Sequence, residues 1–499
     1  MSVVLISFAA YTLAIVLLGL YSARYSKRSD EDFFLAGRSL GPWVAALSAS
    51  ASSESGWVTL GLVGWAFTNG VQAYWIIPGC LLGYLFNWFV IAGRLSDRSR
   101  AVGALTLPDF FAFSFRERVP LLRVLSVIVI LVAMVLYVAA QFAAAGKAFA
   151  ATFTGATFNI TYHQGVWIGA GIVLIYTVSG GFRAVCWTDF LQALLMIGTL
   201  VVFPVYLLIV HGGYGFVNAL LAPVVPSSGQ AGDLLRFFPD LAAPAFLGFL
   251  LGSGALGINF GYPGQPHVLV RFMALHDKKA ARVAGIVAVV WGFLVYWGAV
   301  TIGLFARAMT EEHDAWTAML FDGELSLVVA AINLLPGVLS GMVLAAVLAA
   351  ICSTADSQLV VAASSAANDL YARLCKKSEA GAHPWLNRVV VAALGLIAVW
   401  LVYDQQVQVY KYVLDYGWAI LGASFGPQVI LLLLWKRASY AGCLAGMVSG
   451  FAVAVLWRHF LGNELAGVHV YNLPLAFLAA LVINAVVSVI VPGRSRPAA

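Results

Sequence analysis

Apolar segments of about 17 to 25 residues recur along the chain, and each can cross the hydrocarbon core of a bilayer as one α-helix. They predict thirteen spans, near 3–22, 42–68, 71–93, 122–146, 164–179, 188–211, 241–265, 282–306, 327–360, 387–403, 409–434, 439–461 and 472–492. The chain is 62% hydrophobic and 10% charged, whereas soluble domains carry roughly a quarter charged residues. We therefore expect an all-α membrane protein.

The basic residues predict how these spans are oriented. No basic residue precedes the first apolar segment, and Arg24, Lys27 and Arg28 follow it, which is the reverse of a cleavable signal peptide. The first span then starts outside, and an odd number of spans brings the C-terminus inside. With this orientation, 23 of the 28 Lys and Arg residues are predicted on the inner side, and Arg271 is one of them. The other five, on the outer side, are Lys147, Arg236, Arg307, Lys411 and Arg458.

Several functional classes are disfavoured by what the sequence lacks. The basic residues are spread over short loops, which argues against nucleic-acid binding. The five cysteines are odd in number and form no CxxC pair, which argues against a disulfide framework or a thiolate metal centre. Neither HExxH nor GxSxG occurs among the polar residues of the spans. We expect a protein that is not an enzyme.

The second span has a polar interruption at its centre. It reads Ala49-Ser50-Ala51-Ser52-Ser53-Glu54-Ser55-Gly56-Trp57. Serine and glycine are poor residues for a helix interior, and backbone groups freed inside a membrane must line a cavity or bind a ligand. The alternative, close helix packing through small residues, explains the serines but not Glu54. We expect a broken helix that binds solute and ion, as in secondary transporters.

The ninth span contains a second polar cluster, in which Ser353, Thr354, Asp356 and Ser357 lie within little more than one helical turn. Hydroxyl, carboxylate and carbonyl oxygens suit a small hard cation rather than zinc. A hydrogen-bonded polar seam between helices is the alternative. Asp189, at the inner end of the sixth span, is expected at a similar depth, where a second cation or a hydrogen-bonded acid pair would fit, and Arg183 is a competing partner for it.

A second broken helix is predicted where the seventh span ends, because Asn259-Phe260-Gly261-Tyr262-Pro263-Gly264-Gln265-Pro266-His267 cannot continue a regular helix. Breaks at matching positions in two halves indicate an inverted-repeat transporter. We expect one domain over 1–499, with an extra helix and inner loop (1–41), a first repeat (42–211), a second repeat (241–434) and two C-terminal helices (435–499). His267 is expected to be structural.

The chain resembles the solute:sodium symporter family, and within it bacterial sodium/proline symporters. The resemblance runs nearly end to end and is carried by Gly37-Arg38-Ser39-Leu40-Gly41-Pro42, Ser55-Gly56-Trp57, Thr106-Leu107-Pro108-Asp109, Trp187-Thr188-Asp189, Gly264-Gln265-Pro266-His267, Arg271-Phe272-Met273, Ser353-Thr354-Ala355-Asp356-Ser357-Gln358-Leu359 and Asn368-Asp369-Leu370-Tyr371. It implies a thirteen-helix, LeuT-like fold in a bacterial inner membrane, with sodium-coupled symport of a small organic solute by alternating access.

The resemblance also implies a site. Sodium would bind carbonyls of Ala51, Glu54 and Ala350 with the hydroxyls of Ser353 and Thr354, and a second cation could use Asp189, Ser353, Asp356 and Ser357. Solute would contact Ser53, Ser55, Gly56, Trp57, Tyr137, Tyr262 and Pro266. Arg38 matches a family arginine tied to sodium coupling at the inner face.

This chain departs from the proline symporters at the expected pocket. They carry Asp-Met where it has Ser53-Glu54, and a tryptophan where it has Ile258. Proline or a related amino acid is the expected solute. Another small carboxylate or polar solute is the alternative, because Ile258 frees space and Gln141 adds a polar wall. A transporter-like solute sensor, and proton coupling through Glu54 or Asp356, also stay open, whereas an ion channel is disfavoured.

Overall fold

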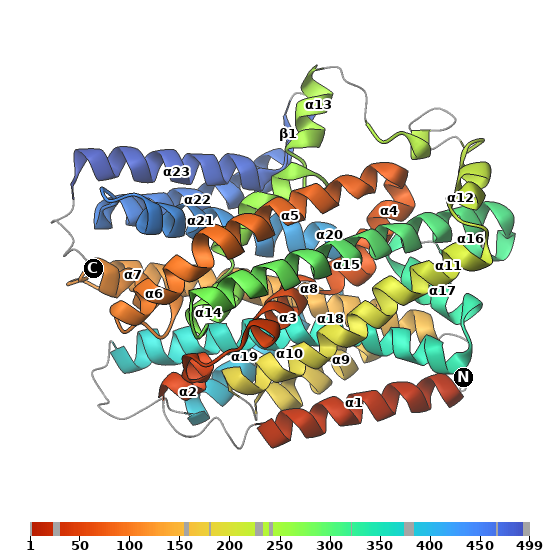
Figure 1. The fold of residues 1–499 in the computed structure, drawn as a ribbon, viewed down its shortest axis with the longest axis horizontal. Helices are drawn as coiled ribbons and strands as arrows, with labels where there is room; N and C mark the ends of the chain where they lie inside the picture. The colour runs from red at the N-terminus through yellow and green to blue at the C-terminus, as the bar shows by residue number, and fades with distance from the viewer. Residues whose placement is uncertain are drawn as a thin grey trace.

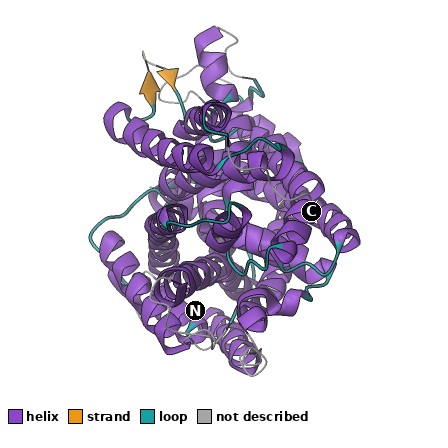
Figure 2. Cartoon of the chain, turned by 90° about the vertical axis from the view of Figure 1, so that its left-hand side faces the viewer, coloured by secondary structure: helices purple, strands orange, loops and turns teal. Residues whose placement is uncertain are grey.

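The computed structural model describes residues 2–22, 30–153, 159–178, 181–224, 233–238, 243–320, 322–373, 384–465 and 468–492. Most of its helices run along the long axis of the molecule (Figure 1), so Figure 2 shows many of them end-on. Helix α1 (Ser2–Ser22) begins at one end, and α23 (Asn472–Ile490) finishes at the other (Figure 1). The strands in the described ranges, β1 (Glu464–Leu465) and β2 (Val468–His469), form a short antiparallel hairpin in which Glu464 lies opposite His469.

The described ranges contain nine helical stretches that are long and apolar enough to cross a membrane, which supports a multi-pass membrane protein. They are Trp57–Ala101, Leu121–Phe153, Phe182–Val210, Lys278–Glu312, Gly337–Ala372, Trp385–Val402, Val409–Leu434, Tyr440–Leu461 and Asn472–Ile490. Shorter apolar helices lie at Val3–Ile15, Tyr162–Ile175 and Gly323–Leu334. The predicted helical membrane fold is confirmed.

The elements of the first half follow in chain order. They are α2 (Asp30–Leu35), η2 (Ala36–Arg38), α3 (Pro42–Ser53), η3 (Trp57–Leu62), α4 (Val63–Asn69), η4 (Gly70–Trp75), α5 (Ile76–Phe86), η5 (Asn87–Ala92), α6 (Gly93–Ala101), α7 (Leu107–Ser114), α8 (Leu121–Phe153), α9 (Tyr162–Thr177), α10 (Phe182–Ile197), η6 (Gly198–Val202), α11 (Phe203–Val210) and α12 (Tyr214–Leu221). Between α4 and η4 the chain turns at Gly70, whose φ of +67° favours glycine.

The second half continues with η7 (Asp233–Leu235), α13 (Ala243–Leu250), η8 (Leu256–Gly264), α14 (Pro266–Met273), α15 (Lys278–Glu312), α16 (Asp314–Met319), η9 (Gly323–Leu325), α17 (Ser326–Leu334), α18 (Gly337–Ser364), η10 (Ser365–Ala372), α19 (Pro384–Val402), α20 (Val409–Tyr412), η11 (Val413–Trp418), α21 (Ala419–Leu434) and α22 (Tyr440–Leu461). The prediction of one continuous helix over the ninth span, 327–360, was wrong, because two helices, α17 and α18, cover it. Pro336 separates α17 from α18, because proline cannot continue a helix interior.

The predicted break in the second span is confirmed. Helix α3 starts after Gly41 with Pro42 in its first turn, where the missing N–H is not needed. It ends at Ser53, and Glu54 leaves the helical region with φ −96° and ψ 77°. A π-helical turn, η3, resumes at Trp57. The residues around the break are fully buried, so its backbone groups need partners inside the protein.

The seventh span is also interrupted, but its predicted end at 265 was too early. The chain passes from α13 through the 3-10 turn η8 into α14, in which Pro266 again stands in the first turn. Side chains satisfy carbonyls at this break. Asn87 Nδ2 donates to the Tyr262 carbonyl (2.8 Å), and Gln265 Nε2 donates to the carbonyl of Gly261 (3.1 Å). Buried carbonyls without such donors would be costly in a membrane.

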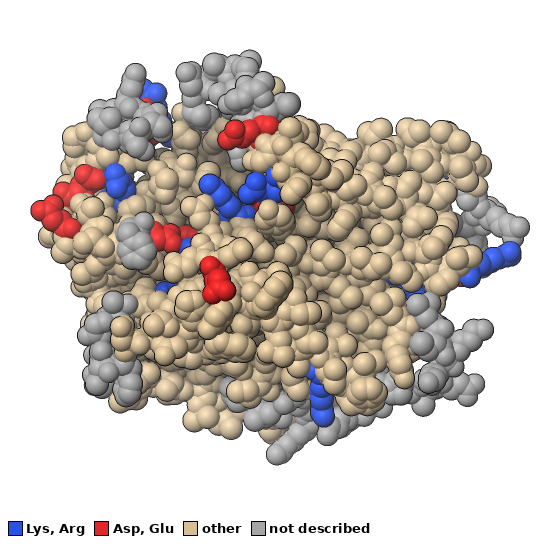
Figure 3. All heavy atoms as spheres, turned by 180° about the vertical axis from the view of Figure 1, so that it is seen from behind, with Lys and Arg blue, Asp and Glu red and all other residues tan. Residues whose placement is uncertain are grey.

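The surface matches a membrane environment. Much of the face in Figure 3 carries no charged side chain, and the acidic side chains visible there lie on its left half. Large apolar side chains such as Ile209, Trp400 and Ile490 are exposed on long helices. In water such a surface would favour aggregation, whereas lipid tails cover it without cost.

Candidate cation and solute site

The end of α3 meets the middle of α18 through hydroxyl and carbonyl oxygens. Ser353 Oγ donates to the carbonyls of Ala51 (2.9 Å) and Ala350 (3.1 Å). The hydroxyl of Thr354, the next residue of α18, donates to the Ser52 carbonyl (3.0 Å). These contacts are fully buried, and they bring together five oxygens from two helices that lie about 300 residues apart in sequence.

This oxygen cluster contains four of the residues predicted for sodium: Ala51, Ala350, Ser353 and Thr354. Oxygen atoms are the ligands that hard cations prefer. The described residues contain no cluster of three or more His, Cys, Asp or Glu side chains, which would favour a transition metal. Sequence reasoning missed the carbonyl of Ser52, which lies one residue from the predicted Ala51.

The carboxylate of Glu54 projects from the break in α3 toward three tyrosines. Its Oε1 accepts hydrogen bonds from Tyr84 Oη (2.8 Å) and from Tyr296 Oη. Tyr262 Oη lies 2.9 Å from that of Tyr296, and because a phenol has one proton, Tyr262 is the donor in this pair when Tyr296 donates to Glu54. Glu54 Oε2 is buried and accepts no hydrogen bond within the described part of the chain.

The other residues predicted to bind solute flank the same break. The Gly56 amide donates to Gln141 Oε1 on α8 (2.9 Å), and Gln141 Nε2 makes no hydrogen bond to the described residues. Trp57 Nε1 donates back to the carbonyl of Ser53 (2.7 Å), and the Ser55 hydroxyl accepts from the Trp57 amide (3.2 Å). The structure therefore brings Ser53, Ser55, Gly56, Trp57 and Gln141 together.

Aromatic side chains border this region from the second break. The ring of Tyr262 packs 4.7 Å from that of Trp418, whose Nε1 donates to the Ile258 carbonyl (3.0 Å). Tyr137 on α8 is fully buried, and its ring lies 6.2 Å from that of His267. Pro266 is buried as well. Sequence reasoning missed Trp418, which brings an aromatic ring from η11 to the backbone of Ile258.

The residues predicted for a second cation are buried, but a guanidinium lies among them. Arg271 Nη2 donates to Asp189 Oδ2 (2.7 Å) and to Ser357 Oγ (2.6 Å), and all three residues are almost fully buried. The placement of Arg271 in an inner loop was therefore wrong, because α14 extends to Met273 and carries it inward. Asp356 is fully buried one residue before Ser357.

Arg183 is not the partner of Asp189. It forms an ion pair with Asp32 (3.1 Å) and donates to the Ala36 carbonyl (2.8 Å) instead. The expectation that Arg183 competes for Asp189 was wrong. Both residues lie on α10, but Asp189 faces α3, where it accepts hydrogen bonds from Ser48 and Ser52.

Arg38 joins the segments that precede α3 and follow α14. Its guanidinium donates to the carbonyls of Met273 (3.0 Å) and Ala104 (2.7 Å) and pairs with Glu31 (2.6 Å). Burial lowers the pKa of Arg38 from its usual value, and the bonded Glu31 carboxylate opposes this shift. Arg38 has a φ of +48°, so the backbone is held in a region that costs side-chain-bearing residues energy. The contacts of its guanidinium offset that cost.

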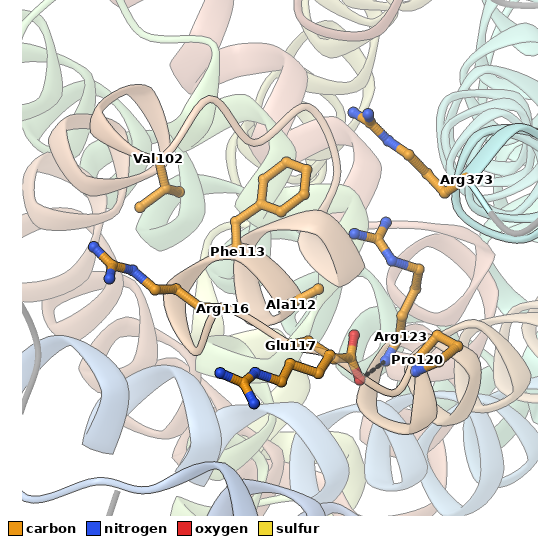
Figure 4. Close-up of a pocket in the computed structure, with 9 residues that line it drawn as sticks. Val102, Ala112, Phe113, Arg116, Glu117, Pro120, Arg123 and Arg373 are labelled. Carbon is orange, nitrogen blue, oxygen red and sulfur yellow. Dashed lines mark hydrogen bonds between the residues drawn. The ribbon is translucent and has the colours of Figure 1, made fainter. Parts of the chain in front are cut away.

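A pocket of about 610 Å³ lies apart from this site. It is lined by Val102, Ala112, Phe113, Arg116, Glu117, Arg118, Pro120, Arg123 and Arg373 (Figure 4). Its four arginines lie between α7 and the start of α8 and at the end of η10, which is the side predicted to face the cytoplasm. None of the residues predicted to bind sodium or solute lines it.

Comparisons with known proteins show the family to which this chain belongs. The model of the "Sodium:solute symporter family" matches residues 33–450. The chain is 36% identical over 459 residues to the "Sodium/proline symporter" of Escherichia coli (strain K12), covering 91% of this chain and 88% of that protein. It is also 36% identical to the "High-affinity proline transporter PutP" of Bacillus subtilis (strain 168), covering 89% of this chain and 90% of that one.

Solved structures support the fold. A substrate-bound, outward-open Na⁺-coupled sialic acid symporter superposes with a TM-score of 0.78 at 17% identity, covering 99% of this chain and 98% of the other. Mhp1, a nucleobase-cation-symport-1 family transporter, superposes with a TM-score of 0.56 at 13% identity, over 94% of this chain and 97% of the other. Family and relatives are transporters, and sodium is the coupling ion. The chain belongs to the sodium:solute symporter family and is a sodium-coupled solute symporter.

Proposed function

We propose that this symporter takes up proline or a related amino acid by alternating access in a bacterial inner membrane, with its N-terminus outside and its C-terminus in the cytoplasm. Sodium binds where α18 meets the end of α3, at the carbonyls of Ala51 and Ala350 and the hydroxyls of Ser353 and Thr354. The observation that carries this is the contact of both hydroxyls with carbonyls next to the break. The carbonyl of Glu54 is the further ligand that the family resemblance implies.

Coupling follows from where that ion binds. A cation held by oxygens of both α3 and α18 fixes these helices in one relative position, and this position organises the break at Glu54, Ser55 and Gly56 for solute. Ion and solute then stabilise the same state, so each raises the affinity for the other. Inward movement of one charge through 100 mV supplies about 2.3 kcal/mol, enough for roughly fifty-fold accumulation of solute.

The chemistry beside the break favours an amino acid over a plain carboxylate. Glu54 Oε2 is a buried carboxylate oxygen that lacks a donor, and no Lys, Arg or His of the described residues pairs with Glu54. Buried acids are paired in nearly all proteins, so a solute ammonium is the natural donor. Gln141, whose Oε1 accepts from the Gly56 amide, has an Nε2 that can donate to the solute carboxylate.

The two repeats proposed from the sequence, 42–211 and 241–434, place one interrupted helix in each half. Both breaks border the proposed solute site, since Tyr262 of the second reaches Tyr296, which donates to Glu54 of the first. Discontinuous helices from two repeats that meet around a central site are the usual construction of such transporters.

The test uses the purified protein in liposomes with an inward sodium gradient and radiolabelled proline. Sodium-driven uptake is expected, and unlabelled proline and other cyclic amino acids should compete. Cyclopentanecarboxylate keeps the ring and the carboxylate of proline but lacks its nitrogen, so it should compete poorly. Equal competition by this analogue would contradict an ammonium partner at Glu54. Binding without net counterflow would favour the alternative, a solute sensor.

A further inference from the structure

Arg271 is a fully buried cation at the meeting point of four helices. From α14, its Nε donates to Ser48 Oγ (2.8 Å) and its Nη2 to Ser52 Oγ (2.7 Å), both on α3. The same Nη2 reaches Asp189 on α10 (2.7 Å) and Ser357 on α18 (2.6 Å). Its Nη1 donates to the carbonyl of His267 within α14. Oxygen acceptors therefore surround the guanidinium on several sides, and the ring of Phe182 lies 5.4 Å from its central carbon.

These acceptors are the kind of oxygens that would otherwise hold an alkali ion. Asp189 Oδ2 also accepts from Ser48 (2.7 Å) and Ser52 (3.1 Å), so one carboxylate and three hydroxyls converge on the guanidinium. Asp189 and Ser357 belong to the set predicted for a second cation. Arg271 is the one basic residue among those described that pairs with Asp189.

A metal cation and the guanidinium cannot both occupy this position. Two like charges about 4 Å apart repel by about 4 kcal/mol even when the surroundings screen them moderately. Removing the partner of a buried carboxylate is costly as well, because the uncompensated charge stays in a medium of low dielectric constant. While Arg271 is present, Asp189 is therefore neutralised without a bound ion.

We propose that the Arg271 guanidinium is a built-in cation that takes the place of a second sodium ion, so that each transport cycle moves one sodium with each solute. This rests on the proposed symport function and on the sodium site at Ser353 and Thr354. A positive charge attached to α14 serves the structural role of an ion at Asp189 but cannot be released with the solute.

The position of Arg271 also gives this charge a role in conformation. Each interrupted helix has one half on the predicted inner side, α3 in the first and α14 in the second. Arg271 connects these two halves to α10 and α18. A bound sodium at Ser353 ties α3 to α18 one turn away. The guanidinium thus links these helices with or without sodium, and a bound sodium adds a second link between α3 and α18.

The first experiment measures the coupling ratio of the unmodified protein in liposomes. The reversal potential of solute flux is determined at several sodium gradients. One sodium per solute is expected, with one net charge moved for a zwitterionic solute. Two sodium ions per solute would overturn the inference. Absence of any sodium-driven flux would instead refute the proposed function, so the two failures differ.

The second experiment removes the guanidinium from its oxygen acceptors. In Arg271→Gln, Asp189 has lost its cation, and a second sodium is expected to bind. The Hill coefficient for sodium, measured by solute binding, should then rise from about 1 toward 2. The double variant Arg271→Gln/Asp189→Asn removes both charges and should return it to about 1. A coefficient that stays at 1 in Arg271→Gln would contradict the built-in cation.

Two further variants separate charge from folding. Arg271→Lys keeps the positive charge and should keep a coefficient of about 1. Arg123→Gln removes another buried arginine, one that pairs with Asp109 and Asp369 away from the proposed site, and should leave the coefficient unchanged. If Arg271→Gln does not fold, the coupling ratio of the unmodified protein still decides the question.

Discussion

The hydroxyl of Ser353 lies 2.9 Å from the carbonyl oxygen of Ala51, although 302 residues separate them in the sequence. The contact joins the middle of an intact helix, α18, to the end of an interrupted one, α3. Ala51 lies two residues before α3 ends, where carbonyls have lost their helical partners. A cation bound between these oxygens would link the two helices.

Changing Glu54 to Gln should weaken solute binding and leave sodium binding nearly unchanged. The variant keeps the shape of the side chain but loses the charge that is proposed to face the solute ammonium. Hydrogen bonds to charged groups contribute about 1.5 to 3 kcal/mol, so an increase of roughly 10- to 100-fold in the solute dissociation constant is expected. Equilibrium binding of labelled solute at saturating sodium measures it.

A suitable control is Asp415→Asn, which neutralises a buried acid that is paired with Arg458 and lies outside the proposed site. It should leave the solute dissociation constant close to that of the unmodified protein. Equal weakening in both variants would point to a general loss of structure rather than to a contact with solute.

Replacing Arg38 by Ala should loosen the inner side of the proposed site. Arg38 holds the segment before α3 against the carbonyls of Met273 and Ala104, and loss of these buried bonds removes that connection. A cysteine placed at the buried Ala45 of α3 should then react faster with a thiol reagent applied from the cytoplasmic side. Arg94→Ala removes an arginine that bonds within its own helix, to the Val90 carbonyl, and should leave the rate unchanged. Equal rates in the Arg38 variant and the parent would contradict this role.

A methyl group at Gly264 should destabilise the second break. An added Cβ would lie 2.5 Å from the carbonyl oxygen of Leu421 and 2.7 Å from the backbone of Gly422, and a backbone cannot move aside easily. Overpacking of this kind costs about 1 to 3 kcal/mol. The thermal stability of Gly264→Ala in detergent should fall, whereas Gly198→Ala, where a Cβ meets nothing within 4 Å, should not destabilise.

The interruptions could be predicted because their causes are local. Serines and a glycine around Glu54 weaken a helix, and prolines at 263 and 266 stop one, whatever the surroundings. The oxygen cluster on α18 followed from helical periodicity alone. The family resemblance then supplied its partner on α3, at Ala51, which no local rule indicates.

Other features depend on contacts between distant segments. Arg271 was assigned to a loop because the seventh span was ended at 265. Pro266 followed by seven residues without a helix breaker is the pattern of a new helix, and it could have indicated that Arg271 turns inward. Nothing near Trp418 in the sequence indicates that its ring lies against Tyr262, 156 residues earlier.

The most direct test of the sodium site is the sodium concentration that gives half-maximal solute uptake, measured for Ser353→Ala, Thr354→Ala and Ser340→Ala. All three remove one hydroxyl from α18, but Ser340 lies near the start of this helix and bonds to the Ala331 carbonyl of α17. The account predicts that the first two raise this concentration at least several-fold, while Ser340→Ala leaves it unchanged. Unaltered sodium dependence in both Ser353→Ala and Thr354→Ala would contradict the proposed site.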